Sequence, residues 1–492
     1  MFHHNVPLML LTYMGTLKTW LYSPLLHFWA TSLCVRIPVL LVGSVTIAAF
    51  FLLVENLHGR TAAWAGTILL STDAVFLLTT CFDWGPVAFQ HFFLVTGLLL
   101  AVRFSATGSR HALFWAFFCF GLAFWDKALF VWIFSGIAAA TLATCRHQLW
   151  KLLSRKNLAI AGFAVLLGAL PLIAYNMYRG FPTVRSNSEF GFDDLPRKVE
   201  VLRLTWDGSI LFGYLINRDD GDHPRLPETP AERFAFRLHT IVGDRWSGWT
   251  EPALLASLAL LPILWFTRSA QLPLFCLIAA AVAWLMMILT KGAGGAVHHT
   301  ILLWPLPQLF VAASLAGASR WLRRSGPAMV VVVTVLLAAQ NLLVLNQYFY
   351  QLVRAGAAGS WSDAIYSLSE VVPKIPATKI VIDDWGIAQP LDLMHRGSLP
   401  LAWAGDPFLE PGTSQDERRY KLALLADPQV LWIGHTDRYQ EFAGINSRLL
   451  AATAAAGFQK LPVTTISDRN GRPVFELFRF ATNSFGAADG HR

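Results

Sequence analysis

Charged residues are scarce in this chain of 492 residues: Asp, Glu, Lys and Arg make up 14% of it, against 55% for the hydrophobic types. A soluble protein of this size carries about a quarter charged residues. This scarcity excludes an ordinary cytosolic enzyme and a disordered chain, and it leaves an integral membrane protein. The net charge of +8 mainly sets orientation in such a protein, so it predicts no nucleic-acid partner.

Cysteine is also rare. The chain has five cysteines, which lie far apart and mostly in apolar runs. No Cys-x-x-Cys pair and no Cys/His ligand spacing occurs, so neither a disulfide framework nor a structural metal site is indicated. The cysteines are Cys34, Cys81, Cys119, Cys145 and Cys276.

Long apolar runs, in contrast, fill the first two thirds of the chain. A membrane span needs about 20 mostly apolar residues. Ten segments are predicted as spans, of which 112–125, 128–144 and 252–266 are short: 37–54, 61–80, 87–103, 112–125, 128–144, 157–178, 252–266, 272–290, 300–318 and 327–346.

The short loops between these segments predict the orientation. One alternating set of loops holds eleven basic residues, from Arg60 to Arg324, whereas the other set holds only Lys127 and Lys291. Basic loops face the cytoplasm. Residues 1–36, the polar stretch 179–251 and the tail from 347 are therefore expected on the outer side.

The alternation of basic loops places the N-terminus outside. Met1–Leu11, however, has neither the basic region nor the cleavage site of a signal peptide. The simplest interpretation is that a leading transmembrane helix is missing. The alternative is a true outer N-terminus.

Two domains are predicted: a membrane domain over 1–346, with an outer loop at 179–251, and an extracytoplasmic α/β domain over 347–492. In the tail, 379–383 and 430–434 have the form of buried strands. Helical spacing occurs near 361–372, 417–426 and 439–456. A hairpin is expected around Asn470-Gly471.

Three polar groups fall at the predicted outer face, and the first contains Lys18. This lysine lies among apolar and aromatic residues ahead of the first span. Its stem can lie on apolar surface while its ammonium meets a lipid phosphate. The alternative is a lysine that only reaches the headgroup level.

The second group is the acidic loop 81–86. Asp83 is the acid between two spans, and carboxylates at this depth usually face a cavity or a partner. A solvated loop acid is the alternative. Asp73, deeper in the same span, could pair with a neighbouring helix. Asp126-Lys127 is either a structural ion pair or part of a headgroup site.

The third group is the glycine-rich segment 291–299, which carries Lys291, His298 and His299. Glycines let backbone N–H groups approach a phosphate, and Lys and His supply charge or donors. Adjacent histidines on one helix point about 100° apart, which disfavours a metal site. Anion recognition and a purely structural turn both remain open.

The stretch 179–251 is rich in arginine, aspartate and tryptophan, including Asp219, Asp220 and Asp222. Tryptophan and paired carboxylates are common in carbohydrate sites. A charge-rich outer loop is also often simply solvated, and that interpretation is favoured for most of these residues.

The order of these motifs resembles the GT-C class of membrane glycosyltransferases, in particular the protein-O-mannosyltransferase-like family 39, which includes bacterial lipid A aminoarabinose transferases. Residues 18–25 are similar to the family's Lys-Pro-Pro-Leu-Tyr-Tyr-Trp segment, and Arg36-Ile37-Pro38 to its Arg-Leu-Pro. Gly59-Arg60 matches a basic turn, Asp83 an outer acid, and residues 299–305 an Arg/His-Tyr-Leu-Leu-Pro segment.

The resemblance implies a polytopic inner-membrane enzyme that uses a polyprenyl-phosphate-linked sugar as donor. It implies phosphate contacts from Lys18, His298, His299 and Lys291, and a catalytic or positioning role for Asp83, with a divalent metal ion as a possible cofactor. The family's catalytic Asp-Glu pair precedes the lysine motif, whereas no acid precedes Glu55 here. The principal base would then lie upstream of Met1.

If Lys18 and His299 serve one phosphate, they should lie within about 10 Å of each other, and Asp83 should face the same cavity. The acceptor would be a protein, lipid or glycan that the sequence does not specify. A transporter or flippase of lipid-linked sugars, and a non-catalytic membrane scaffold, are the alternative functions.

Overall fold

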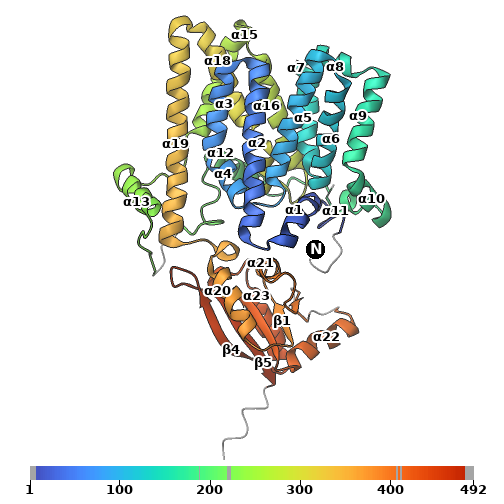
Figure 1. The fold of residues 1–492 in the computed structure, drawn as a ribbon, viewed down its shortest axis with the longest axis vertical. Coiled ribbons are helices and arrows are strands. Elements are labelled where there is room, and N and C mark those ends of the chain that lie inside the picture. The colour runs from blue at the N-terminus through green and yellow to red at the C-terminus, as the bar shows by residue number, and fades with distance from the viewer. Residues whose placement is uncertain (1–6, 188, 219–222, 406–407, 410–412, 483–492) are drawn as a thin grey trace, which may run out of the picture.

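A computed structural model describes residues 7–187, 189–218, 223–405, 408–409 and 413–482. Figure 1 shows a bundle of long helices above a smaller part that contains a β-sheet. The chain is a polytopic α-helical membrane protein with a C-terminal α/β region, as the sequence predicts.

By length and composition, five of the described helical segments can cross a membrane, or up to seven if each of two bent helix pairs is one span. The five are α2 (Ser32–His58), α5 (Val87–Thr107), α16 (Gln271–Leu289), Val297–Trp321, which comprises α17 (Val297–Thr300), η1 (Ile301–Leu303) and α18 (Leu306–Trp321), and α19 (Gly326–Ala355). Every predicted span coincides with one of these segments, with a bent pair or with shorter helices.

Each bent pair has a local cause for its bend. Helices α3 (Arg60–Thr72) and α4 (Ala74–Cys81) meet at 56° because Asp73 ends one and caps the other by accepting from the amide of Phe76 at 2.8 Å. Its second oxygen accepts from Gln308 of α18 at 2.8 Å, so Asp73 does contact a neighbouring helix. Helices α9 (Arg155–Gly168) and α10 (Leu170–Arg179) meet at 67° beside Pro171, which lacks an N–H group.

The remaining short predicted spans are α6 (Arg110–Asp126), α7 (Phe130–Thr144) and the pair α14 (Thr250–Ala259) and α15 (Leu261–Phe266). One close approach holds α7 against α16. A Cβ atom on Gly136 would lie 2.2 Å from the carbonyl oxygen of Ala279, so glycine is required at that crossing.

The stretch 179–251, predicted as an outer loop between two spans, has secondary structure of its own. It contains α11 (Pro182–Asn187), α12 (Leu195–Trp206) and α13 (Pro230–Val242), although Asp219, Asp220 and Asp222 lie outside the described residues. Thr229 and Glu232 form a capping box at the start of α13. The helix packs on α19, where the rings of His239 and Tyr350 stack 3.7 Å apart.

The C-terminal sheet has five strands in the order β2-β1-β3-β5-β4. Strands β1 (Lys379–Ile382), β2 (Leu401–Trp403) and β3 (Val430–His435) are parallel, and β5 (Pro473–Thr482) pairs antiparallel with β3 and with β4 (Phe458–Ser467). The predicted strands β1 and β3 and the hairpin are confirmed. Strand β2 and helix α21 (Ala388–Met394) were not predicted, because each is too short to give a periodic signal.

Three further helices cover the sheet: α20 (Ala364–Val371), α22 (Gln415–Ala426) and α23 (Ile445–Ala455). The core of the sheet region divides into two clusters, one around Ile382 and Phe475 and one around Trp432 and Phe480. These clusters lie on opposite sides of the sheet because side chains alternate along each strand.

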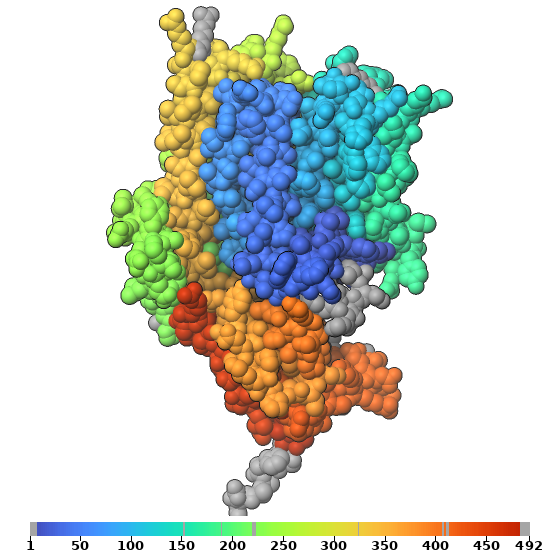
Figure 2. All heavy atoms as spheres, viewed as in Figure 1, coloured from blue at the N-terminus to red at the C-terminus, as the bar shows by residue number. Residues whose placement is uncertain are grey.

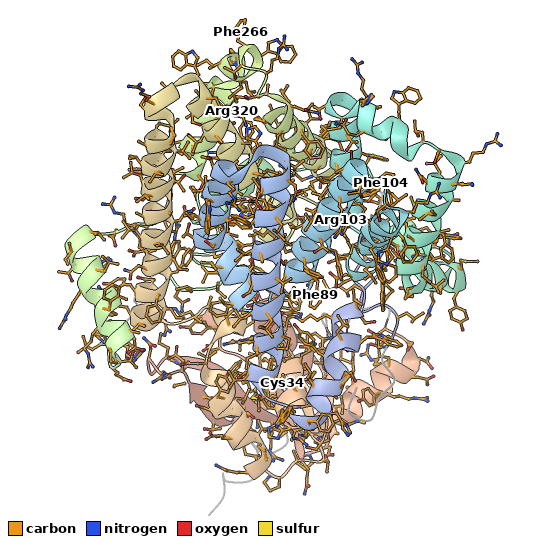
Figure 3. The ribbon with its side chains drawn as sticks, turned by 45° about the horizontal axis from the view of Figure 1, so that its top comes forward. Cys34, Phe89, Arg103, Phe104, Phe266 and Arg320 are labelled. Carbon is orange, nitrogen blue, oxygen red and sulfur yellow. The ribbon has the colours of Figure 1, made fainter. Side chains whose placement is uncertain are left out.

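The two ends of the helical bundle differ in charge. Helices α8 (Arg146–Leu152) and α15 and the start of α19 lie at the end farthest from the sheet (Figure 1), and Arg320 and Phe266 mark that end in Figure 3, whereas Cys34 of α2 lies next to the C-terminal region. The basic loops thus gather at the end opposite the sheet, as the alternation of charge predicts.

The C-terminal region sits directly against the bundle (Figure 2). Its hairpin turn reaches α19, where the side-chain amide of Asn470 donates to the carbonyl of Arg354 at 2.8 Å. Within the turn, the buried pair Arg472–Asp468 fixes the backbone that carries Asn470. The hairpin therefore holds the sheet region to the end of the last long helix.

Candidate functional site

Lys18 and Asp83 meet at the end of the bundle next to the C-terminal region. Lys18 is in the first turn of α1 (Leu17–Phe28), and its ammonium group donates to the Asp83 carboxylate and to the carbonyl of Gly85 at 3.3 Å. Asp83 lies in the turn between α4 and α5 with φ 54°, a conformation that aspartate tolerates better than most residues. The turn thereby directs the carboxylate at α1.

The Asp83 carboxylate is largely enclosed, with its side chain 7% exposed. Burial raises the pKa of Asp83, while the positive charges of Lys18 and Arg36 oppose this rise. A carboxylate with a raised pKa, once ionised, is a stronger base and can accept a proton from a hydroxyl brought next to it.

Asp83 lies in the wall of a cavity of about 730 Å³ between the bundle and the C-terminal region. Arg36 of α2 lines the same cavity, with its guanidinium 5.7 Å from the ring centroid of Phe82. Within the described part of the chain Arg36 forms no ion pair, whereas the other cation lining the bundle side, Arg225, is paired with Glu232 at 2.7 Å. Arg36 is therefore a free cation available to an anionic ligand.

The C-terminal region supplies the opposite wall of this cavity. Trp361 comes from the short helix η3 (Gly359–Trp361), and Arg469 and Asn470 come from the hairpin turn. The cavity therefore exists only where the two parts of the chain meet.

The segment before α1 runs along the loop between α6 and α7. Gly15 donates to the carbonyl of Asp126 at 3.0 Å, and Ala128 donates to the carbonyl of Tyr13 at 2.8 Å. A Cβ atom on Gly15 would lie 1.9 Å from the carbonyl oxygen of Trp125, so only glycine fits there. This contact fixes the position of Lys18 relative to Asp126 and Lys127.

Asp126 and Lys127 are both buried, each with 1% exposure. Asp126 accepts from the side-chain amide of Gln90 at 2.9 Å, and the Lys127 ammonium donates to the carbonyl of His298 at 2.8 Å. Burial lowers the pKa of Lys127 to about 8, and the negative charge of Asp126 opposes this lowering. The two residues thus join the N-terminal segment to the segment that carries His298 and His299.

The glycine-rich segment 291–299, which carries His298 and His299, is packed into the bundle. His299 is 8% exposed, its ring lies 5.5 Å from that of Trp132, and its Nδ1 accepts from the amide of Gly294 at 3.2 Å. The amide of Gly292 donates to Asp193 at 3.2 Å. At least these two glycine amides therefore already have protein partners.

Lys291 is the remaining predicted phosphate contact. It is exposed and paired with Glu189 at 2.9 Å. The described lining of the cavity includes Asp83 but does not include Lys18, Lys291, His298 or His299. Lys18 reaches the cavity through its bond to Asp83, and a cavity shared with His299 stays a prediction.

Sequence reasoning missed two features of this site. Tyr22 is 4% exposed, and its hydroxyl is buried without a hydrogen bond among the described residues, beside the ring–ammonium contact with Lys18 at 5.5 Å. Arg36 was noted only as part of a motif. Its position one turn into the first long helix was the available signal, since a cation there lies at headgroup depth.

A second buried polar cluster lies at the carboxyl ends of β1 and β3. His435 Nδ1 lies 2.9 Å from an oxygen of Asp384, and both side chains are fully buried. Asp384 also accepts from the amides of Trp385 at 2.8 Å and Glu441 at 2.9 Å. Glu441 in turn accepts from the hydroxyl and amide of Ser360, next to Trp361. The cluster thus fixes the cavity wall to the sheet.

Within the described residues, no group of three or more His, Cys, Asp or Glu side chains is placed to hold a metal ion. We assign no step of chemistry to a metal.

No protein-family model matches the sequence, and no curated protein sequence matches it. The structure is similar to ArnT from Cupriavidus metallidurans bound to undecaprenyl phosphate, with TM-score 0.50, 13% identity, and 95% of this chain and 88% of that chain covered. The apo state of that protein gives TM-score 0.50 at 14% identity, covering 94% and 86%. The oligosaccharyltransferase AglB from Archaeoglobus fulgidus, in complex with an inhibitory peptide and a dolichol-phosphate, gives 0.48 at 12%, covering 99% and 69%.

At these identities the ArnT similarity defines the fold alone. The chain has the GT-C-like architecture of a multi-spanning helical bundle followed by an α/β region, and its cavity lies between the two.

Proposed function

We propose that this protein transfers a sugar from a polyprenyl-phosphate-linked donor to an acceptor at the outer face of the cytoplasmic membrane. The observation that carries the proposal is the cavity where Asp83, bonded to Lys18, and the unpaired Arg36 meet at the end of the membrane helices. A lipid phosphate lies at this depth, and the carrier chain can remain in the bilayer. The fold shared with a protein crystallised with undecaprenyl phosphate supports the proposal.

In the proposed reaction, a nucleophilic group of the acceptor attacks the anomeric carbon of the sugar. The bond between that carbon and the phosphate oxygen breaks, and the carrier phosphate leaves with the electron pair. Asp83 takes the proton of the nucleophile, and Arg36 and Lys18 stabilise the charge that develops on the phosphate. His298, His299 and Lys291 remain proposed as further phosphate contacts.

We further propose the division into a membrane domain over 1–346 and an extracytoplasmic domain over 347–492. Reporter fusions near residue 150 and at the C-terminus should then report opposite sides of the membrane, because α8 and the C-terminal sheet lie at opposite ends of the bundle. A cytoplasmic reporter at both positions would contradict the orientation and the outer placement of the site.

The direct test of the function is binding of undecaprenyl phosphate to the purified full chain, measured by native mass spectrometry. We expect Arg36→Gln to weaken this binding about 10- to 150-fold, because a charge-assisted hydrogen bond contributes about 1.5–3 kcal/mol. Arg60→Gln is the matched control: Arg60 is exposed, is paired with Glu55, and lies beyond the opposite end of α2.

Equal carrier affinity in the wild type and in Arg36→Gln would remove Arg36 from the site. No carrier binding at all would favour the scaffold. Carrier binding with translocation, but with no transfer or hydrolysis of carrier-linked hexoses and pentoses, would favour the flippase.

A further inference from the structure

Four aromatic side chains form a cluster that includes the two chain neighbours of Asp83. Phe82 and Trp84 flank it in the α4–α5 turn, Tyr214 comes from the segment after α12, and Trp361 comes from η3. Trp84 and Tyr214 are stacked, with centroids 5.1 Å apart and planes 9° apart. Trp361 meets Trp84 at 5.6 Å and Phe82 at 6.1 Å, edge to face. We call these four residues the aromatic wall.

The aromatic wall borders the cavity beside its charged groups. Phe82 and Trp361 line the cavity together with Asp83 and Arg36. The wall is also only partly covered, since Tyr214 is 42% exposed and both tryptophans are intermediate in exposure. A cluster that served packing alone would bury its rings more completely.

The polar edges of the wall are available to a ligand. Within the described part of the chain, the indole N–H groups of Trp84 and Trp361 have no hydrogen-bond partner. Neither N–H group is buried. An aromatic ring with a free N–H at its edge offers an apolar face and a donor together. The ring of a sugar has the complementary surface: C–H groups on its face and hydroxyl groups around its rim.

Two sets of hydrogen bonds hold the wall in place. Ala358 donates to the carbonyl of Leu215 at 3.1 Å, which ties the Tyr214 segment to the segment that leads into η3. Ser360, next to Trp361, is bonded through its amide and hydroxyl to Glu441. A preorganised surface of this kind binds a ligand without an ordering cost.

We propose that the aromatic wall is the subsite for the sugar ring of the carrier-linked donor, and this inference rests on the function proposed above. With the phosphate at Arg36, the sugar lies over Phe82 and Trp361, and its anomeric carbon faces Asp83. The C-terminal region, through Trp361, then contributes directly to recognition of the sugar.

The test compares two ligands, undecaprenyl phosphate alone and the same carrier bearing a hexose, an aminosugar or a pentose. We expect wild type to bind at least one sugar-bearing carrier more tightly than the bare carrier. In Trp361→Leu, the ratio of the affinity for the sugar-bearing carrier to that for the bare carrier should fall by about tenfold or more. Binding of the bare carrier should change by less than about twofold. Trp361→Phe, which keeps a ring, should retain most of the preference.

Trp403→Leu is the matched control, because Trp403 is an exposed tryptophan (48%) of the same region at the end of β2. Tyr214→Leu serves as a second variant if Trp361→Leu does not fold. An equal loss of both ligands in the tryptophan variant, or a wild type without any preference for a sugar-bearing carrier, would overturn the subsite. Failure to bind even the bare carrier would instead overturn the proposed function.

Discussion

Asp83→Asn should lower the rate of sugar transfer by about 10²- to 10⁴-fold, the usual contribution of a positioned proton acceptor. Asparagine keeps an oxygen that can accept from Lys18, so the turn between α4 and α5 should keep its shape. It loses the basicity, and with it the ability to take a proton from the acceptor. Transfer and hydrolysis of radiolabelled carrier-linked sugars by the purified full chain measure the effect.

The control for this prediction is Glu55→Gln, which alters the exposed pair with Arg60 at the other end of α2. Binding of the bare carrier to Asp83→Asn should stay within about threefold of wild type, because the chief phosphate contact in the proposed site is Arg36. A variant that retains full transfer activity would show that another group is the proton acceptor.

Lys18 needs a double variant for its role to be seen. Lys18→Met alone leaves the enclosed Asp83 carboxylate without its partner, and removing one member of such a pair costs about 3–5 kcal/mol. Lys18→Met combined with Asp83→Asn removes both charges and should recover most of that stability. Carrier affinity in the double variant, compared with Asp83→Asn alone, then reports the contribution of Lys18 to phosphate binding.

The second large effect is expected in the C-terminal region: Asp384→Ala should destabilise it by about 3–5 kcal/mol. The change leaves His435 and the amides of Trp385 and Glu441 buried without their acceptor. Hydrogen exchange of β1 and β3 in the full chain measures the loss, and Glu370→Ala on the exposed face of α20 is the control. Unchanged protection of both strands would contradict the structural role of the cluster.

The same cluster predicts a sensitivity to acid. Burial acts to raise the pKa of Asp384, but the bonds from His435 and the Glu441 amide hold it below its usual range. A carboxylate with a lowered folded-state pKa contributes stability above its unfolded pKa of about 3.9, and that contribution is lost as the pH falls through the folded value. Asp384→Asn should therefore be less stable than wild type at neutral pH, and the difference should shrink in acid.

Much of the architecture followed from the sequence because hydrophobic patterning is a local property. The ten apolar segments, the alternation of basic loops, strands β1 and β3 and the hairpin at Asn470 are each encoded within about twenty residues. A cavity or a partner for Asp83 was also among the expectations, since carboxylates at that depth usually face one.

The tertiary structure decided which partner each polar group has, because those partners come from distant parts of the sequence. Asp73 is bonded to Gln308, Lys127 to the carbonyl of His298, and Lys291 to exposed Glu189. The sequence placed Lys18, Asp83 and the histidines at one membrane face, but a membrane face is a plane on which side chains can be tens of ångströms apart. Only the packing of α1 against the α4–α5 turn brought Lys18 to Asp83, and only the seating of the C-terminal region brought Trp361 beside them.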